Sequence, residues 1–177
     1  MTYTTRLGMP ADAPALAALH TASWRAWYGP YMPAGRLGAQ LDTHMQARWE
    51  TWPADRLVVV AEDAGCIVGF GAVVRGADPL LDNLHVDPGW QSRGIGAALL
   101  RGIAAHLASE GMHGFYLTVL EGNVAARRFY RRNGGQEGPV HDDRLLDHPV
   151  RVVPVRWSAP ACAALAAEFA SEVGKDA

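Results

Sequence analysis

The stretch from Leu80 to Arg101 constrains the fold of this 177-residue chain more than any other part of it. An apolar segment turns at Asp87-Pro88-Gly89, passes through a loop with two glycines and enters a run rich in alanine and leucine. A second apolar segment, Phe115 to Leu120, comes next. Strand, helix and strand in this order form a right-handed crossover, so we expect the two strands to lie parallel in one sheet.

The loop between the first strand and the helix reads Gln91-Ser92-Arg93-Gly94-Ile95-Gly96. Its glycines have no Cβ, so an anion can approach the backbone, and the helix that follows adds unpaired N–H groups and partial positive charge. Together these features predict a phosphate site, flanked by the guanidinium of Arg93. Gly-x-Gly turns also serve as close-packing devices, so the loop alone leaves both interpretations open.

The rest of the chain alternates between strand and helix patterns. The expected strands are residues 3–7, 56–62, 66–74, 80–86, 115–120, 136–146 and 150–157. The first expected helix opens at Asp12, and the others cover residues 36–49, 92–110, 123–133 and 161–173. The pattern predicts an α/β fold, a single domain over residues 1–158 with a mixed sheet of about seven strands and about four flanking helices. Residues 159–177 form a helical extension that packs on this domain or, alternatively, makes a homodimer contact.

Composition excludes several classes of partner. Hydrophobic residues make up 49% and charged residues 19%, as in a soluble globular protein. A net charge of −2 gives no case for nucleic acid or an anionic membrane, and no apolar run approaches the roughly 18 residues of a membrane span. The N-terminal residues lack a signal layout, so we expect a cytoplasmic protein. Cys66 and Cys162 do not form a metal-ligand spacing, and no metal site is expected.

Aromatic residues gather where the first helix breaks at Gly29-Pro30. Loops at such a break are held by rigid neighbours and often line a pocket mouth. Trp24 and Tyr28 are therefore candidates for substrate binding, with ordinary core packing as the alternative. For Trp27 we expect core packing.

A second candidate site follows the second strand of the parallel pair. That strand ends at Leu120-Glu121-Gly122, and a helix starts at Asn123. Ligands of parallel sheets bind at the carboxyl ends of the strands, where both helix N-termini point. Tyr130 lies seven residues, or about two turns, into this helix.

The two motifs together resemble those of the GCN5-related N-acetyltransferase (GNAT) family. The first is Gln91-x-x-Gly94-x-Gly96 after a strand ending L-x-V-x-P, and the second is Asn123-x-x-Ala126-x-x-x-Tyr130 followed by glycine. Their order, their separation and the succession of elements from residue 3 to residue 157 also match the family. The resemblance implies an enzyme that uses acetyl-CoA, bound in a cleft at the parallel strand pair.

The resemblance also implies roles for individual residues. Main-chain groups of Leu84 and Val86, with His85 between them, would pair with the pantetheine arm. Asn123 and Ala126 would border the cofactor. Tyr130 would bind the CoA sulfur and protonate the leaving thiolate; its alternative is an ordinary buried aromatic. The pyrophosphate would rest on the loop and first helical turn, formed by Gln91, Ser92, Arg93, Gly94, Ile95, Gly96 and Ala97.

The general base is where this sequence departs from the family. Many members carry a glutamate at the position of Leu80. Asp82, His85 and Glu121 are the nearby substitutes, and His85 has an ordinary pKa suited to the task. A site that desolvates the ammonium form needs no dedicated base, so this alternative also stays open.

The sequence therefore predicts an N-acetyltransferase that moves an acetyl group from acetyl-CoA to a primary amine of a small molecule, peptide or protein, by direct attack. A non-catalytic acyl-CoA-binding module, acting as a sensor or subunit, is the alternative. A dinucleotide-binding oxidoreductase is a weaker rival, because the third glycine of its fingerprint would fall at Leu99.

Overall fold

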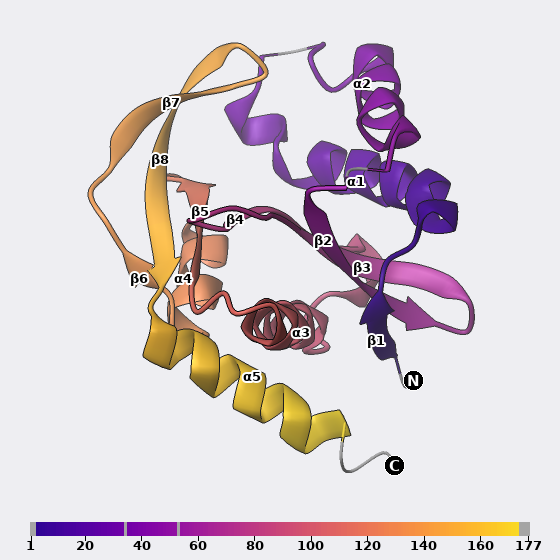
Figure 1. Ribbon diagram of the computed structural model, residues 1–177. Helices are drawn as coiled ribbons and strands as arrows, with labels where there is room; N and C mark the ends of the chain where they lie inside the picture. Colours follow the sequence, from indigo (N-terminus) through magenta and orange to yellow (C-terminus); the bar gives the residue numbers. More distant parts are fainter. Residues whose placement is uncertain (1–2, 34, 53, 174–177) are drawn as a thin grey trace. The chain divides into compact units, whose positions relative to one another are not determined.

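The computed structural model describes residues 3–33, 35–52 and 54–173 (Figure 1). The strands are β1 (Thr4–Leu7), β2 (Arg56–Asp63), β3 (Cys66–Val74), β4 (Leu80–Val86), β5 (Phe115–Leu120), β6 (Gln136–Glu137), β7 (His141–Leu145) and β8 (His148–Trp157). The α-helices are α1 (Ala13–Trp27), α2 (Ala39–Glu50), α3 (Ile95–Ser109), α4 (Val124–Arg132) and α5 (Ala159–Val173). The strands form one mixed sheet in the order β1-β2-β3-β4-β5-β8-β6, with β7 paired to β8. This confirms the predicted fold class.

The chain divides into two compact units. The first unit comprises residues 1–72 and 83–99, and the second comprises residues 73–82 and 100–177. The first unit therefore holds α1, α2 and the loop before α3, and the second holds β5, α4 and α5.

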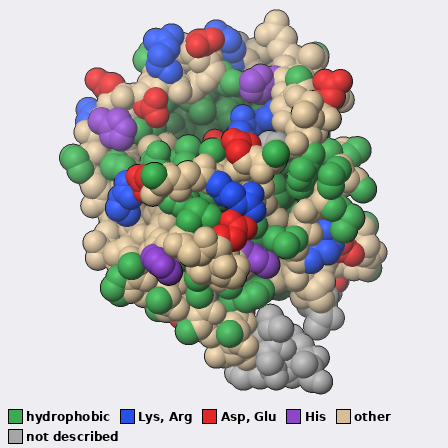
Figure 2. All heavy atoms as spheres, in the orientation of Figure 1, with side chains coloured by type: hydrophobic (Ala, Val, Ile, Leu, Met, Phe, Trp, Pro, Cys, Tyr) green, Lys and Arg blue, Asp and Glu red, His purple; other side chains and the backbone are tan. Residues whose placement is uncertain are grey.

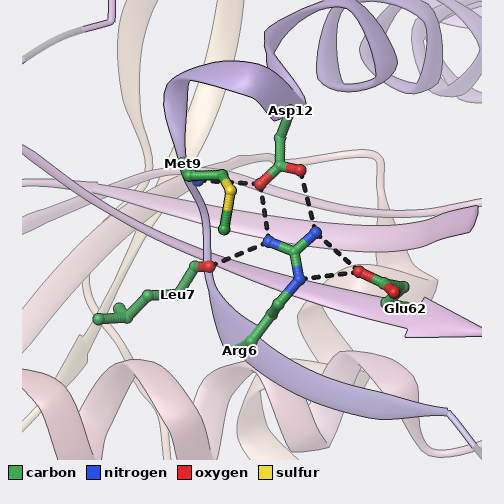
Figure 3. Close-up of polar contacts among 5 residues, drawn as sticks. All are labelled: Arg6, Leu7, Met9, Asp12 and Glu62. Atoms are coloured by element: carbon green, nitrogen blue, oxygen red, sulfur yellow. Dashed lines mark hydrogen bonds and ion pairs between the residues drawn. The ribbon is translucent and has the colours of Figure 1, made fainter. Parts of the chain in front are cut away.

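An arginine network fixes the start of the first unit (Figure 3). Arg6 on β1 donates to the carboxylate of Asp12 at 2.8 and 2.9 Å and to that of Glu62 on β2 at 2.8 Å. The main-chain N–H of Met9 donates to the same Asp12 carboxylate at 2.9 Å. Asp12 stands at the N-cap position of α1 as predicted, but its side chain serves this network and makes no cap hydrogen bond.

The core of the first unit lies between α1, α2 and the β2–β3 hairpin. Leu16, Trp49, Val60 and Phe70 are among its fully buried members. The prediction that Trp27 belongs to the core is wrong, since 46% of this side chain is exposed. Trp27 is the last residue of α1. The helical spacing of apolar residues includes it, but the packing of α1 against its neighbours ends before this position.

Two turns follow from local backbone conformation. The β2–β3 hairpin turns through Ala64 and Gly65, both with positive φ, as a two-residue turn of the mirror-image type requires. The second helix was expected from residue 36, yet α2 begins at Ala39. Residues 35–38 form turns in which Gly38 N–H donates to the carbonyl of Gly35, itself at φ +87°.

Helix α3 carries an apolar stripe at helical spacing. Ile95, Leu99, Ile103 and Leu107 are all at most 1% exposed. Gly69 on β3 lets this helix approach closely, because a Cβ there would lie 2.9 Å from Cγ2 of Ile95. The helix ends at Ser109, and Gly111 follows at φ +79°, the conformation of a glycine cap.

The second unit is built on β5 and β8. Parallel pairing joins Leu80 of β4 to Tyr116 of β5, as the crossover predicted. β8 runs antiparallel to β5, from Phe115↔Trp157 to Leu120↔Val152. β6 and β7 also pair with β8. The single strand expected over residues 136–146 is therefore two strands.

The β7–β8 turn lies earlier than predicted. Leu146 and Asp147, at φ +47° and +63°, make the two-residue turn, and His148 and Pro149 already belong to β8. The turn-favouring residues Asp147, His148 and Pro149 predicted a break that lies one to two positions after the observed turn. The reason is that leucine at position 146 gives no sequence signal of a left-handed backbone.

Helix α5 packs within the second unit. Cys162 and Leu165 are buried, and Phe169 contacts the ring of His106 on α3. Arg101 of α3 makes ion pairs with Glu168 and Glu172 at 3.6 and 3.0 Å. The homodimer contact stays a prediction.

Two features of the described residues bear on partners. None of the helices there combines the length and apolarity needed to cross a bilayer. No group of three or more His, Cys, Asp or Glu residues within that part of the chain could hold a metal ion. On the face drawn in Figure 2, acidic and basic side chains are interspersed.

Candidate active site

The loop between β4 and α3 has a backbone conformation set by Ser92 and Gly94, at φ +60° and +82°. Before it, Asp87 accepts a hydrogen bond from Gly89 N–H at 2.8 Å and so holds the turn that follows β4. The helix was expected from Ser92 but begins at Ile95, because neither left-handed residue fits a right-handed helix. The N–H groups of the first turn have no intrahelical acceptor, so they are available to an anion.

Arg93 lies over the loop itself. Its guanidinium stands 4.7 Å from the centre of the Trp90 ring and donates to the carbonyl of Gly89 at 3.3 Å. A cation stacked on an indole keeps its charge while losing conformational freedom. The positive charge predicted beside the phosphate loop is therefore held at the loop.

Strand β4 presents its candidate residues on two faces. Successive side chains of a strand point to opposite sides, so Asp82 and His85 lie on opposite faces. Asp82 is exposed, whereas His85 contacts the rings of Phe70 and His20 at 5.4 and 4.7 Å. Burial, and secondarily the positive charge of Arg48, lower the pKa of His85 to about 4. The two candidate bases therefore differ both in the strand face they occupy and in their exposure.

Trp24 and Tyr28, the predicted substrate-binding pair, stack on each other at the end of α1. Their ring centres are 4.5 Å apart and their planes differ by 13°. Trp24 is 8% exposed and Tyr28 is half-buried. Arg25 holds the following loop by donating to the carbonyl of Leu37 and pairing with Asp42 at 2.6 Å. The pair thus sits beside a loop fixed by hydrogen bonds.

Helix α4 begins with the predicted cap. The Asn123 side chain accepts from Ala126 N–H at 3.1 Å. Tyr130, half-buried, stands edge-on to Trp157 with ring centres 5.9 Å apart. Asn123, Ala126 and Tyr130 are thereby brought onto one short helix in the second unit. Glu121, another candidate base, forms an ion pair with Arg151 at 3.1 Å.

Sequence reasoning missed three residues that hold α4 in place. Trp157 Nε1 donates to the carbonyl of Asn133 at 2.7 Å, at the end of the helix. Arg127 donates to both carboxylate oxygens of Glu137 at 3.0 and 2.8 Å and to the carbonyl of Glu121 at 3.0 Å. The pKa of Glu137 is lowered chiefly by its hydrogen bond from Arg127. The only sequence signal was a tryptophan at the end of a strand and an arginine-rich helix followed by an acidic residue.

Comparison with known proteins gives this arrangement a family. The model of the acetyltransferase (GNAT) family matches residues 17–135, a span that includes the β4–α3 loop and α4. The chain belongs to the GNAT family. This confirms the resemblance drawn from the two motifs and contradicts the dinucleotide-binding alternative.

Individual GNAT relatives support the same conclusion. An uncharacterized N-acetyltransferase of Mycobacterium bovis is 30% identical over 142 residues, covering 77% of this chain and 91% of that protein. A mycothiol acetyltransferase of Thermobispora bispora is 37% identical over 93 residues, 48% of this chain and 32% of that protein. The solved PaiA N-acetyltransferase of Thermoplasma acidophilum, in complex with coenzyme A, has a TM-score of 0.70 and 18% identity over 89% of this chain and 99% of that one. This last likeness concerns the fold.

Proposed function

We propose that this GNAT protein transfers the acetyl group of acetyl-CoA to a primary amine. The observation that carries the proposal is the loop before α3, where left-handed Ser92 and Gly94 lead into a helix N-terminus inside the family match. Such a loop suits a pyrophosphate, which is what distinguishes a CoA ester from a simple thioester. The likeness to a protein named mycothiol acetyltransferase makes small-molecule amines the first acceptors to test, with peptide and protein amines next.

The proposed cofactor contacts are those named from the sequence. Main-chain N–H groups of residues 91–97 hold the pyrophosphate, and Arg93 adds a cation. Main-chain groups of Leu84, His85 and Val86 pair with the pantetheine arm in the manner of an added strand. Asn123 and Ala126 border the arm from α4. The first turn of α4 leaves room there because residue 126 is an alanine.

The proposed reaction is a direct attack of a neutral amine on the thioester. A carbon–nitrogen bond forms, the carbon–sulfur bond breaks, the amine loses one proton and the thiolate gains one. Tyr130 supplies the proton to the thiolate and regains one from solvent. Asp82, an exposed carboxylate, is our candidate to accept the proton of the amine, directly or through water.

A thiol-release assay tests the proposal. The purified protein is given acetyl-CoA and a panel of small-molecule and peptide amines, and mass spectrometry identifies the acetylated product. We expect one or more amines to raise thiol release well above the rate without amine. A thermal shift with CoA but no release across the panel would favour the non-catalytic binding module. No thermal shift with CoA would contradict both. Cytoplasmic location stays a prediction.

A further inference from the structure

Two histidines from distant parts of the chain meet inside the first unit. His20 on α1 is 2% exposed, and its ring centre lies 4.7 Å from that of His85 on β4. The rings of Trp24, Trp49 and Phe70 also contact His20, at 6.0, 6.3 and 5.6 Å. His85 keeps some exposed surface. The buried imidazole of His20 therefore lies beside the partly exposed imidazole of His85.

The hydrogen bond from Trp49 fixes which nitrogen of His20 carries the proton. Trp49 Nε1 donates to His20 Nδ1 at 3.3 Å. An indole nitrogen is only a donor, so Nδ1 must present its lone pair and the ring proton must sit on Nε2. Protonating His20 would set two N–H groups against each other. His20 therefore stays neutral while this contact holds.

The resulting Nε2–H of His20 is a donor with no hydrogen-bond partner among the described residues. Buried donors are rarely left unpaired, because losing water without gaining an acceptor is costly. Of the four rings around His20, the indoles of Trp24 and Trp49 and the phenyl of Phe70 offer no lone pair in the ring plane. A ring nitrogen of His85 does, and the two ring centres are 4.7 Å apart.

We propose that His20 is a positioning residue which, by donating to one nitrogen of His85, leaves the proton of His85 on the other nitrogen, where it donates to the thioester carbonyl oxygen. His85 then acts as a hydrogen-bond donor to the oxygen on which negative charge develops, and not as the general base. The hydrogen bonds then all run in one direction: Trp49 donates to His20, His20 to His85, and His85 to the substrate. This inference rests on the proposed acetyl transfer.

Electrostatics agree with this geometry. Burial lowers the pKa of His20 to about 2, and burial also lowers the pKa of His85 to about 4. The charged and titratable groups that lower the pKa of His20 besides burial are His85, Arg48, His44 and Arg56, and Arg48 also lowers the pKa of His85. A group with so low a pKa has little affinity for a proton at neutral pH and is a poor general base for an amine. A donor needs only the neutral ring, which is the form present.

Nitrogen-15 NMR of the imidazole rings tests the first half of the proposal. We expect His20 protonated on Nε2 and His85 in one dominant tautomer. His20→Phe keeps a ring in place but removes the donor, so His85 should become a mixture of tautomers. Trp49→Phe should let His20 adopt both tautomers. His141→Phe, a change at an exposed histidine of β7, is the control. Ser23 on α1 offers the competing acceptor, because its buried Oγ also has no hydrogen-bond partner among the described residues. An unchanged His85 tautomer in His20→Phe would point to that acceptor and overturn the proposal.

Kinetics test the second half with the amine that gives most thiol release. A glutamine at position 85 can donate an N–H but cannot act as a base at neutral pH. We expect His85→Gln to keep kcat within about tenfold of wild type, and His85→Phe to lose about 10²-fold or more. His20→Phe should also lower kcat, and the His20→Phe/His85→Phe double variant should lose no more than His85→Phe.

The outcomes separate this inference from the proposed function. Equal losses in His85→Gln and His85→Phe, or additive losses in the double variant, overturn the inference while acetyl transfer stands. Absence of turnover in the wild type overturns the proposed function, and with it the catalytic role of His85. Circular dichroism and a melting curve for each variant confirm that it is folded.

Discussion

The indole nitrogen of Trp157 lies 2.7 Å from the carbonyl oxygen of Asn133, so the last residue of β8 holds the end of α4. The same indole stands edge-on to Tyr130 at 5.9 Å. Gly135, just beyond the helix, allows this approach, because a Cβ there would lie 2.6 Å from Val155 and 2.9 Å from Trp157. One side chain therefore fixes both the end of the helix and the ring that we propose as the catalytic acid.

The first prediction concerns Trp157→Phe. The variant keeps an aromatic ring but leaves the Asn133 carbonyl without its donor, which should lower the free energy of unfolding by about 1–3 kcal/mol. For a chain of this size that is a fall in Tm of about 2–4 °C per kcal/mol. We also expect kcat to fall, because Tyr130 loses its support. Trp27→Phe, at a side chain that is 46% exposed, is the control, and an equal effect on kcat in both variants would contradict the positioning role.

The second prediction concerns Tyr130→Phe, which removes only the hydroxyl. Loss of a general acid should lower kcat by about 10²- to 10⁴-fold, with KM for acetyl-CoA within about twofold of wild type. Tyr116→Phe on β5 makes the same chemical change in the same unit, where the ring packs against Arg156 at 4.9 Å. Steady-state kinetics of both variants decide the point. A similar kcat in wild type and Tyr130→Phe would remove Tyr130 from the mechanism.

Features that depend on residues close together in the sequence could be predicted. The Asn123 cap, the glycine after α3 and the stripe of Ile95 and Leu99 each depend on residues within a few turns of one another. The parallel strand pair followed from the order of elements and the handedness of the crossover. Family membership followed because both motifs are themselves local.

Features that depend on distant contacts or unusual backbone could not be predicted. The sequence gives no indication that His20 lies beside His85, or that Trp157 lies beside Asn133. Helical periodicity identifies the apolar face of α1 but not where the packing against that face ends. Trp27 was therefore wrongly assigned to the core. Left-handed Ser92 and Leu146 shifted a helix start and a turn, because serine and leucine, unlike glycine, give no sequence signal of that conformation.

The third prediction concerns two glycines with nearly the same conformation, Gly94 at φ +82° and Gly111 at φ +79°. Alanine at either position should cost about 1–2 kcal/mol of stability for its left-handed backbone. Only Gly94→Ala also places a methyl group in the proposed phosphate loop. Its Cβ would lie 3.5 Å from the Tyr3 hydroxyl, an ordinary contact, so the chain itself has room for it.

We therefore expect Gly94→Ala to weaken CoA binding at least about tenfold, or 1.4 kcal/mol, and Gly111→Ala to leave it unchanged. Isothermal titration with CoA measures both. Equal CoA affinity in the two folded variants would show that the loop does not hold the pyrophosphate.

The fourth prediction concerns the pH dependence of stability from Arg6 and Asp12. The hydrogen bond from Arg6 is the largest cause that lowers the pKa of the Asp12 carboxyl below its ordinary value. A carboxyl whose pKa is depressed in the folded state contributes stability that is fully present above its unfolded pKa, about 3.9. That contribution is lost as the pH falls through the folded pKa.

Asp12→Asn should therefore lower the free energy of unfolding at pH 7, by about 1–3 kcal/mol, because the amide cannot replace a charge-assisted pair. The difference from wild type should shrink as the pH falls from about 4 toward 2, because the carboxyl of the unfolded wild-type chain is protonated there before that of the folded state. Urea unfolding at pH 7, 5, 4, 3 and 2 measures it, with Asp55→Asn at an exposed turn as the control. A difference that stays constant down to pH 2 would mean that Asp12 stabilises β1 and α1 by its shape and not by its charge.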